Sequence, residues 1–103
     1  MNDNEMTIQR EDGDTDGRYV IKLSPSAEAE MTYRKTDKGI MIIDHTGVPD
    51  DWRGQGVGKA LVQRAVEDAR ARKIQIVPLC PFAKAQIDKT PDWQDVLKPA
   101  SER

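Results

Sequence analysis

The segment Arg53–Gly58, with the sequence R-G-Q-G-V-G, has the residue types that suit an anion. It lies between an apolar stretch and a stretch with helical periodicity, so its glycines fall at the start of a predicted helix. The first turn of a helix carries unpaired backbone N–H groups and the positive end of the helix dipole. Glycines let a phosphate approach those groups, and Arg53 and Lys59 add positive charge. The segment therefore predicts a phosphate site; the alternative is a loop that only turns the chain, although its glycines would weaken the helix.

Two common phosphate-binding motifs do not fit this segment. The P-loop needs a glycine five places before its last glycine and a hydroxyl residue after its lysine, but Arg53 and Ala60 occupy these places. The dinucleotide fingerprint needs G-x-G-x-x-G, whereas the chain has G-x-G-x-G and is too short for a full doubly wound domain. Hydrolysis of nucleoside triphosphates and dinucleotide binding are therefore both disfavoured.

A second chemical signal comes from His45 and Cys80, which end the predicted strands on either side of the helix. If these strands are parallel neighbours, both residues lie at the sheet edge where α/β crevices bind ligands. A thiolate is a competent acyl acceptor, and a neighbouring imidazole could lower its pKa or take its proton. The alternatives are a small buried hydrophobic residue at Cys80 and a structural histidine at His45. Asp44 would point to the opposite face of its strand, which leaves the pair without an orienting third group.

Hydrophobic periodicity predicts the elements that must position these residues. Alternation of apolar and polar residues indicates strands, and helical spacing of apolar residues indicates the helix after the glycine turn. We also expect Asp68 and Arg72 to form an ion pair along that helix. The predicted elements are a weak edge strand at Thr7–Arg10, strands at Arg18–Leu23, Ala27–Arg34 and Ile40–Asp44, a helix at Gly56–Arg72, a strand at Ile74–Leu79, and a short helix at Pro81–Lys89 that Pro91 ends.

The order of these elements predicts an α+β fold with a mixed sheet. Strands joined by short turns should be antiparallel, whereas a strand–helix–strand crossover makes its two strands parallel. We expect antiparallel N-terminal strands, one βαβ crossover with a central helix, and a short C-terminal helix. The 103 residues fit a single domain over residues 1–103, with frayed ends at 1–4 and 99–103.

Composition disfavours several classes of partner. The net charge is −2 and no basic stripe stands out, so nucleic-acid binding is disfavoured. No apolar run is long enough to span a bilayer, and no signal pattern begins the chain, so we expect a cytoplasmic protein. The single cysteine excludes an internal disulfide and a metal cage of several thiolates, and we expect no metal site. An exposed edge strand could pair with a second copy, so we expect a monomer or a weak homodimer.

Three segments together resemble a known family. Arg53-x-x-Gly56-x-Gly58 matches the R/Q-x-x-G-x-G/A motif of the GCN5-related N-acetyltransferases. The segments D-H-T-G-V-P at 44–49 and V-P-L-C-P-F at 77–82 make the chain similar to a subfamily of very small members of about this length. The resemblance covers roughly Gly17 to Leu97. That subfamily lacks the N-terminal helices with which larger members build the acceptor site.

The resemblance implies acetyl-CoA, or another acyl-CoA, as the small-molecule partner, with its pyrophosphate on the backbone amides of the glycine turn. It implies that Cys80 lies near the acetyl group, with His45 as a candidate partner. The residues assigned to cofactor binding are Val48, Arg53, Gly54, Gln55, Gly56, Val57, Gly58 and Lys59.

The chain also departs from the subfamily pattern. Gln86, Thr90 and P-D-W at 91–93 stand where tyrosine, histidine and P-E-Y are common, and Gly47 follows H-T where glutamate is common. Tyr19 and Tyr33 lie in early strands, so neither replaces the tyrosine acid of larger relatives. The predicted function is acetyl transfer to an unidentified amine, with Cys80 as a candidate carrier. The alternatives are a non-catalytic acyl-CoA-binding module or sensor, and an interaction protein that has lost the ligand.

Overall fold

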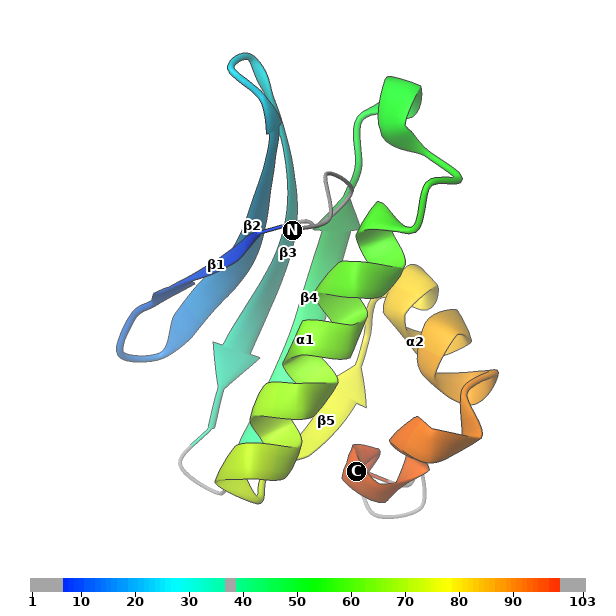
Figure 1. Ribbon diagram of the computed structural model, residues 1–103. Coiled ribbons are helices and arrows are strands. Elements are labelled where there is room, and N and C mark those ends of the chain that lie inside the picture. The colour runs from blue at the N-terminus through cyan, green and yellow to red at the C-terminus, as the bar shows by residue number, and fades with distance from the viewer. Residues whose placement is uncertain (1–6, 37–38, 99–103) are drawn as a thin grey trace.

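The computed structural model describes residues 7–36 and 39–98, which form a five-stranded mixed sheet with two α-helices against one face (Figure 1). The strands lie side by side in chain order, from β1 to β5. The elements are β1 Ile8–Asp12, β2 Asp16–Ser24, β3 Ala27–Lys35, β4 Ile40–Gly47, the 3₁₀ helix η1 Asp50–Trp52, α1 Val57–Arg72, β5 Gln75–Pro78, α2 Pro81–Asp88 and the 3₁₀ helix η2 Pro91–Val96. The ends predicted to fray, 1–4 and 99–103, lie outside the described residues.

The pairing of the strands confirms the predicted α+β fold. β1, β2, β3 and β4 pair antiparallel in turn, and β4 pairs parallel with β5 after the crossover through α1. Several bounds differ from the predicted ranges by one or two residues, and the 3₁₀ helix η1 was not predicted. Two further differences concern the site. β4 continues past Asp44 to Gly47, and η2 forms where the sequence indicated only a break at Pro91.

One hydrophobic core fills the space between the sheet and the helices. β3 buries Ala29, Met31 and Tyr33 and leaves the residues between them more exposed, as the period-two pattern predicts. α2 contributes Ala83 and Ile87 to the same core. The buried stripe of α1 is Val57, Gly58, Leu61, Val62, Ala65, Val66 and Ala69. The amino end of this helix is therefore fixed at the carboxyl end of β4, close to the start of α2.

A β-bulge in β4 changes which residues face the core. Met31 lies opposite Thr46 and Tyr33 lies opposite Ile43, so one extra residue of β4 fits between these pairs. Such a bulge shifts the alternation of side chains by one place. Asp44 and His45 consequently both face away from the helices, and Thr46 returns to the core side.

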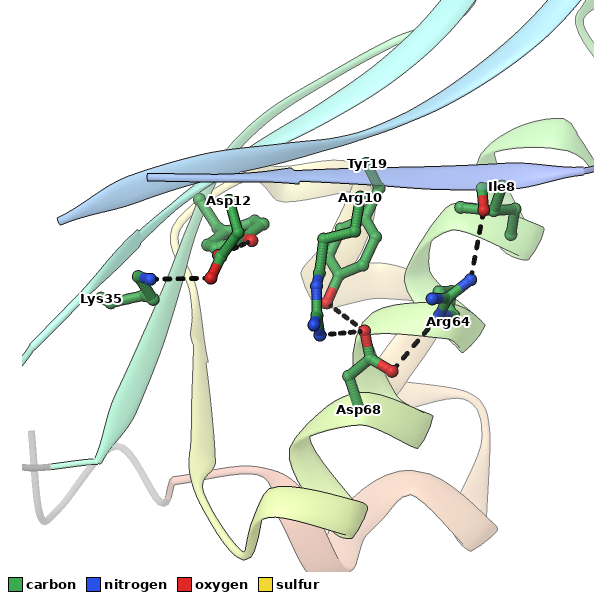
Figure 2. A network of polar contacts seen from close by, with 8 residues as sticks. Ile8, Arg10, Asp12, Tyr19, Lys35, Arg64 and Asp68 are labelled. Atoms are coloured by element: carbon green, nitrogen blue, oxygen red, sulfur yellow. Dashed lines mark hydrogen bonds and ion pairs between the residues drawn. The ribbon is translucent and has the colours of Figure 1, made fainter. Parts of the chain in front are cut away.

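Asp68 of α1 ties the helix to the first two strands (Figure 2). It accepts hydrogen bonds from the Tyr19 hydroxyl at 2.8 Å, from Arg10 at 3.0 Å and from Arg64 at 3.2 Å. Arg64 also donates to the carbonyl of Ile8 at 3.3 Å. The predicted partner of Asp68, Arg72, was therefore wrong, because the carboxylate turns towards the sheet rather than along the helix. This network holds the edge strand β1, which the apolar pattern predicted only weakly.

Candidate functional site

A cleft of about 730 Å³ opens between the glycine turn, the end of β4 and one side of α2. Three of its lining residues are cations, and no carboxylate from the described part of the chain lines it. Such a lining favours an anionic ligand. The lining residues are Thr46, Val48, Trp52, Arg53, Gly54, Gly56, Val57, Gly58, Lys59, Phe82, Gln86, Lys89 and Thr90.

Two glycines of the turn adopt a backbone conformation that other residues rarely take. Gly54 has φ of 79° and Gly56 has φ of 81°, both in the left-handed region. A Cβ atom added at either position would meet nothing within 4 Å. Both glycines therefore shape the turn and leave open space beside its backbone.

The first N–H groups of α1 face this open space without acceptors. The first bond of the helix runs from the Ala60 N–H to the Gly56 carbonyl at 3.0 Å, and no side chain caps the helix. The N–H groups of Val57, Gly58 and Lys59 thus have no acceptor among the described residues. Three such donors at the positive end of a 16-residue helix are suited to hold a phosphate.

Gly58 has a different role from the other two glycines. A Cβ atom at this position would lie 2.5 Å from Cζ of Phe82, a distance that real side chains do not show. The missing side chain lets the ring of Phe82 rest against α1, although Phe82 stays 38% exposed in the wall of the cleft. The third glycine of the motif therefore serves packing between α1 and α2.

Cys80 precedes the first turn of α2 and contacts Thr46 of β4. Its thiol donates to Oγ1 of Thr46, with 3.5 Å between sulfur and oxygen. Burial raises the pKa of the Cys80 thiol. Its hydrogen bonds with the Thr46 side chain and with the backbone of Ala83, Phe82 and Thr46 outweigh this effect, so the net pKa lies below the ordinary value. A cysteine at the amino end of a helix commonly has a lowered pKa, which increases the fraction of the nucleophilic thiolate.

His45 does not join Cys80. It pairs across the sheet with Thr32 and is exposed, and its imidazole Nε2 would lie 3.4 Å from a Cβ atom at Gly47. The bulge turns His45 to the outer face of the sheet, whereas Cys80 belongs to the core on the inner face. Thr46 occupies the place beside the thiol that the sequence suggested for His45.

Most of the residues predicted to bind the cofactor line the cleft. Arg53 stands at its rim, 72% exposed, with an ion pair to Asp50 at 3.2 Å. Gln55 does not line the cleft; its side chain donates to the carbonyl of Asp51 at 3.3 Å. Cys80 itself, 5% exposed, lies next to the wall rather than in it, since its neighbours Thr46 and Phe82 form the lining.

Sequence reasoning missed the side of the cleft that α2 supplies. Phe82, Gln86, Lys89 and Thr90 recur at helical spacing, and that spacing next to the cysteine segment could have indicated a shared face. No comparable signal marks Thr46, because the bulge that redirects it depends on pairing with β3.

The described residues hold no group of three or more histidine, cysteine, aspartate or glutamate side chains that could bind a metal ion. Among the same residues, no helix has the length and apolar character needed to cross a membrane.

Comparison with known proteins bears on this site. Residues 18–96 match a protein family described as GCN5-related N-acetyl-transferase. The solution structure of a GCN5-like protein from Staphylococcus aureus, whose name assigns it to the N-acetyltransferases, is 38% identical, covers 95% of this chain and 91% of its own, and superposes with a TM-score of 0.69. An IAA acetyltransferase from Bacillus cereus is similar in fold, with 24% identity, a TM-score of 0.59, and coverage of 73% of this chain and 53% of its own.

Proposed function

This chain belongs to the GCN5-related N-acetyltransferase family, and from that membership we propose that it binds acetyl-CoA in the cleft and transfers the acetyl group to an unidentified amine. The observation that carries the proposal is the glycine turn. Three backbone donors without acceptors face a cleft lined by three cations, as a site for pyrophosphate requires.

Each part of the cleft has a proposed role. The N–H groups at the start of α1 hold the pyrophosphate, and Lys59 adds charge beside them. Arg53 exchanges its exposed aspartate partner for a phosphate oxygen. Val48, which follows β4 and lines the cleft, contacts the pantetheine arm, and this leads the thioester towards Thr46 and Cys80.

We further propose that Cys80 is the acyl carrier. Acetyl-CoA supplies an activated acetyl group as a thioester. The Cys80 thiolate attacks the thioester carbonyl, a new carbon–sulfur bond forms at Cys80, and the bond to coenzyme A breaks with release of its thiolate. Thr46 supports this step, because its hydroxyl donates to the sulfur once the thiol has lost its proton.

A second function, binding of acyl-CoA without chemistry, is favoured by two observations. Cys80 is nearly buried and does not line the cleft. Both tyrosines of the chain are buried in the sheet, where Tyr19 donates to Asp68 and Tyr33 donates to Asp12. Neither tyrosine lines the cleft, so neither stands ready to protonate a departing thiolate.

Binding is tested by thermal unfolding with and without ligands. We expect acetyl-CoA to raise the melting temperature, because a ligand bound only by the folded state stabilises it. Acetyl-pantetheine, which lacks the pyrophosphate, should stabilise far less at the same concentration. Equal stabilisation by both compounds would remove the glycine turn from the binding site.

Chemistry is tested by intact-mass measurement after timed exposure to acetyl-CoA. We expect one thiol-linked acetyl group on the wild type and none on Cys80→Ser, while Cys80→Ser keeps its affinity for coenzyme A within about tenfold, or about 1.4 kcal/mol. His45→Ala is the matched control for a base role, and its position on the outer face predicts unchanged labelling. Binding without any label would favour the non-catalytic function.

We also propose that residues 1–103 form a single domain, and that the protein acts in the cytoplasm as a monomer or a weak homodimer. One shared hydrophobic core supports the single domain. Sedimentation over a range of concentrations would reveal a strong oligomer and so refute the proposed state.

A further inference from the structure

The cleft extends beyond the glycine turn along one face of α2. Phe82, Gln86 and Thr90 are spaced by four residues, and Lys89 follows Gln86 by three. All four line the cleft, so they share one side of the helix and its end. At a rise of about 1.5 Å per residue, this face is about 12 Å long. That length exceeds what a pyrophosphate at the turn would occupy.

Lys89 brings a cation to the far end of this face. It lies just after the last residue of α2 and has no ion pair with any described residue. Lys84, on another side of the same helix, is already paired with Asp88 at 2.6 Å and does not line the cleft. Arg53 and Lys59 belong to the opposite wall, at the glycine turn. A second anionic group, separate from the pyrophosphate, would explain the lysine at this position.

We propose that Lys89 binds the phosphate on the ribose of coenzyme A, so that the site distinguishes coenzyme A from dephospho-coenzyme A. The inference rests on the proposed function, because it takes the pyrophosphate at the glycine turn as its starting point. Coenzyme A carries its 3′-phosphate on the nucleoside that follows the pyrophosphate. A nucleoside leaving the turn along α2 brings this phosphate to the end of the helix, where Lys89 stands.

The test is calorimetric titration of coenzyme A and dephospho-coenzyme A into the wild type, Lys89→Ala and Lys84→Ala. Both substitutions remove one positive charge from α2 or its end, so their long-range effects on an anionic ligand are similar. We expect Lys89→Ala to weaken coenzyme A about fivefold and to leave dephospho-coenzyme A within about twofold, as an exposed ion pair would. Lys84→Ala should change neither affinity, and Lys89→Arg should retain the preference for coenzyme A.

Two results would overturn this inference while leaving the proposed function intact. Equal loss of both ligands in Lys89→Ala would place the lysine against the pyrophosphate that they share. Unchanged binding of both would make Lys89 an ordinary solvated side chain. Failure of the wild type to bind either ligand would instead refute the proposed function and this inference with it.

Discussion

The two halves of α1 differ in whether their polar groups have hydrogen-bond partners within the protein. In the middle of the helix, Asp68 accepts from Tyr19, Arg10 and Arg64, and Arg64 reaches the carbonyl of Ile8 (Figure 2). At the amino end, three N–H groups have no acceptor among the described residues, and Lys59 forms no ion pair with any of those residues. One half of the helix is closed by contacts within the protein, and the other half is open to a ligand.

This difference separates the scaffold from the site. Polar groups in folded proteins almost always have partners, so a satisfied network is explained by the fold alone. Donors that face a cleft without acceptors need water or a ligand to complete them. Substitutions in the two halves should therefore affect different properties, namely stability in one and ligand affinity in the other.

Asp68→Ala should have the largest effect, and it should fall on stability. The side chain is only 17% exposed, and its removal leaves the Tyr19 hydroxyl and two guanidinium groups without their acceptor. We expect the free energy of unfolding to fall by about 2–3 kcal/mol. Urea denaturation measures this loss, and calorimetry on the folded variant should find the affinity for acetyl-CoA within about twofold of the wild type.

Asp95→Ala is the control for this substitution. Asp95 also accepts from an arginine of α1, Arg70, but both side chains are about half exposed. Exposed ion pairs contribute little, so this variant should lose much less stability than Asp68→Ala. Equal losses in the two variants would contradict the view that the Asp68 network holds the sheet to the helix.

Gly56→Ala should have the next largest effect, and it should fall on affinity. The added methyl group projects into the open space beside the turn, where the phosphate would approach. We expect acetyl-CoA to bind at least about tenfold more weakly, together with a loss of about 1–2 kcal/mol of stability from the left-handed backbone. Calorimetry and urea denaturation separate the two effects.

Gly39→Ala provides the matched control for backbone strain. Gly39 has φ of 75°, close to that of Gly56, but it lies in the turn before β4, where a Cβ atom would meet only Ile74 at 3.6 Å. This variant should lose a similar amount of stability and keep its affinity. If both glycine variants bind acetyl-CoA equally well, the turn does not hold the ligand.

Thr46→Val should have the smallest effect, on the reactivity of Cys80. Valine keeps the shape of threonine and removes the hydroxyl that stabilises the thiolate. Loss of a donor to the charged form raises a thiol pKa, so the midpoint of Cys80 alkylation should move to higher pH. Intact-mass measurement of iodoacetamide labelling across pH gives this midpoint. Thr46→Ser should restore it, and an unchanged midpoint in Thr46→Val would assign the low pKa to the helix start alone.

The sequence predicted the fold well because its signals are local. Period-two alternation in β3 and helical spacing in α1 depend on which face of one element is buried, and both agree with the structure. The glycine turn was predicted for the same reason, since its residues are contiguous and their conformation is set by the turn.

The chemistry beside the turn was harder to predict, because it depends on pairing between distant segments. His45 and Thr46 exchange sides through a bulge that only the register with β3 reveals. Asp68 turns away from Arg72 because Arg10 and Tyr19, far away in the sequence, supply better partners. Lys89 enters the cleft only when α2 packs beside the glycine turn.

The most direct test is a titration of isotope-labelled protein with acetyl-CoA, followed through the backbone amide signals. We expect the largest chemical-shift changes at Val57, Gly58 and Lys59, whose N–H groups would donate to the pyrophosphate, and at the adjoining Gly56. Arg64 and Asp68 should change little. Acetyl-pantetheine at the same concentration should leave the turn signals nearly unchanged. Saturable binding whose largest shifts lie elsewhere, or the absence of any shift at the turn, would contradict the assignment of the glycine turn as the pyrophosphate site.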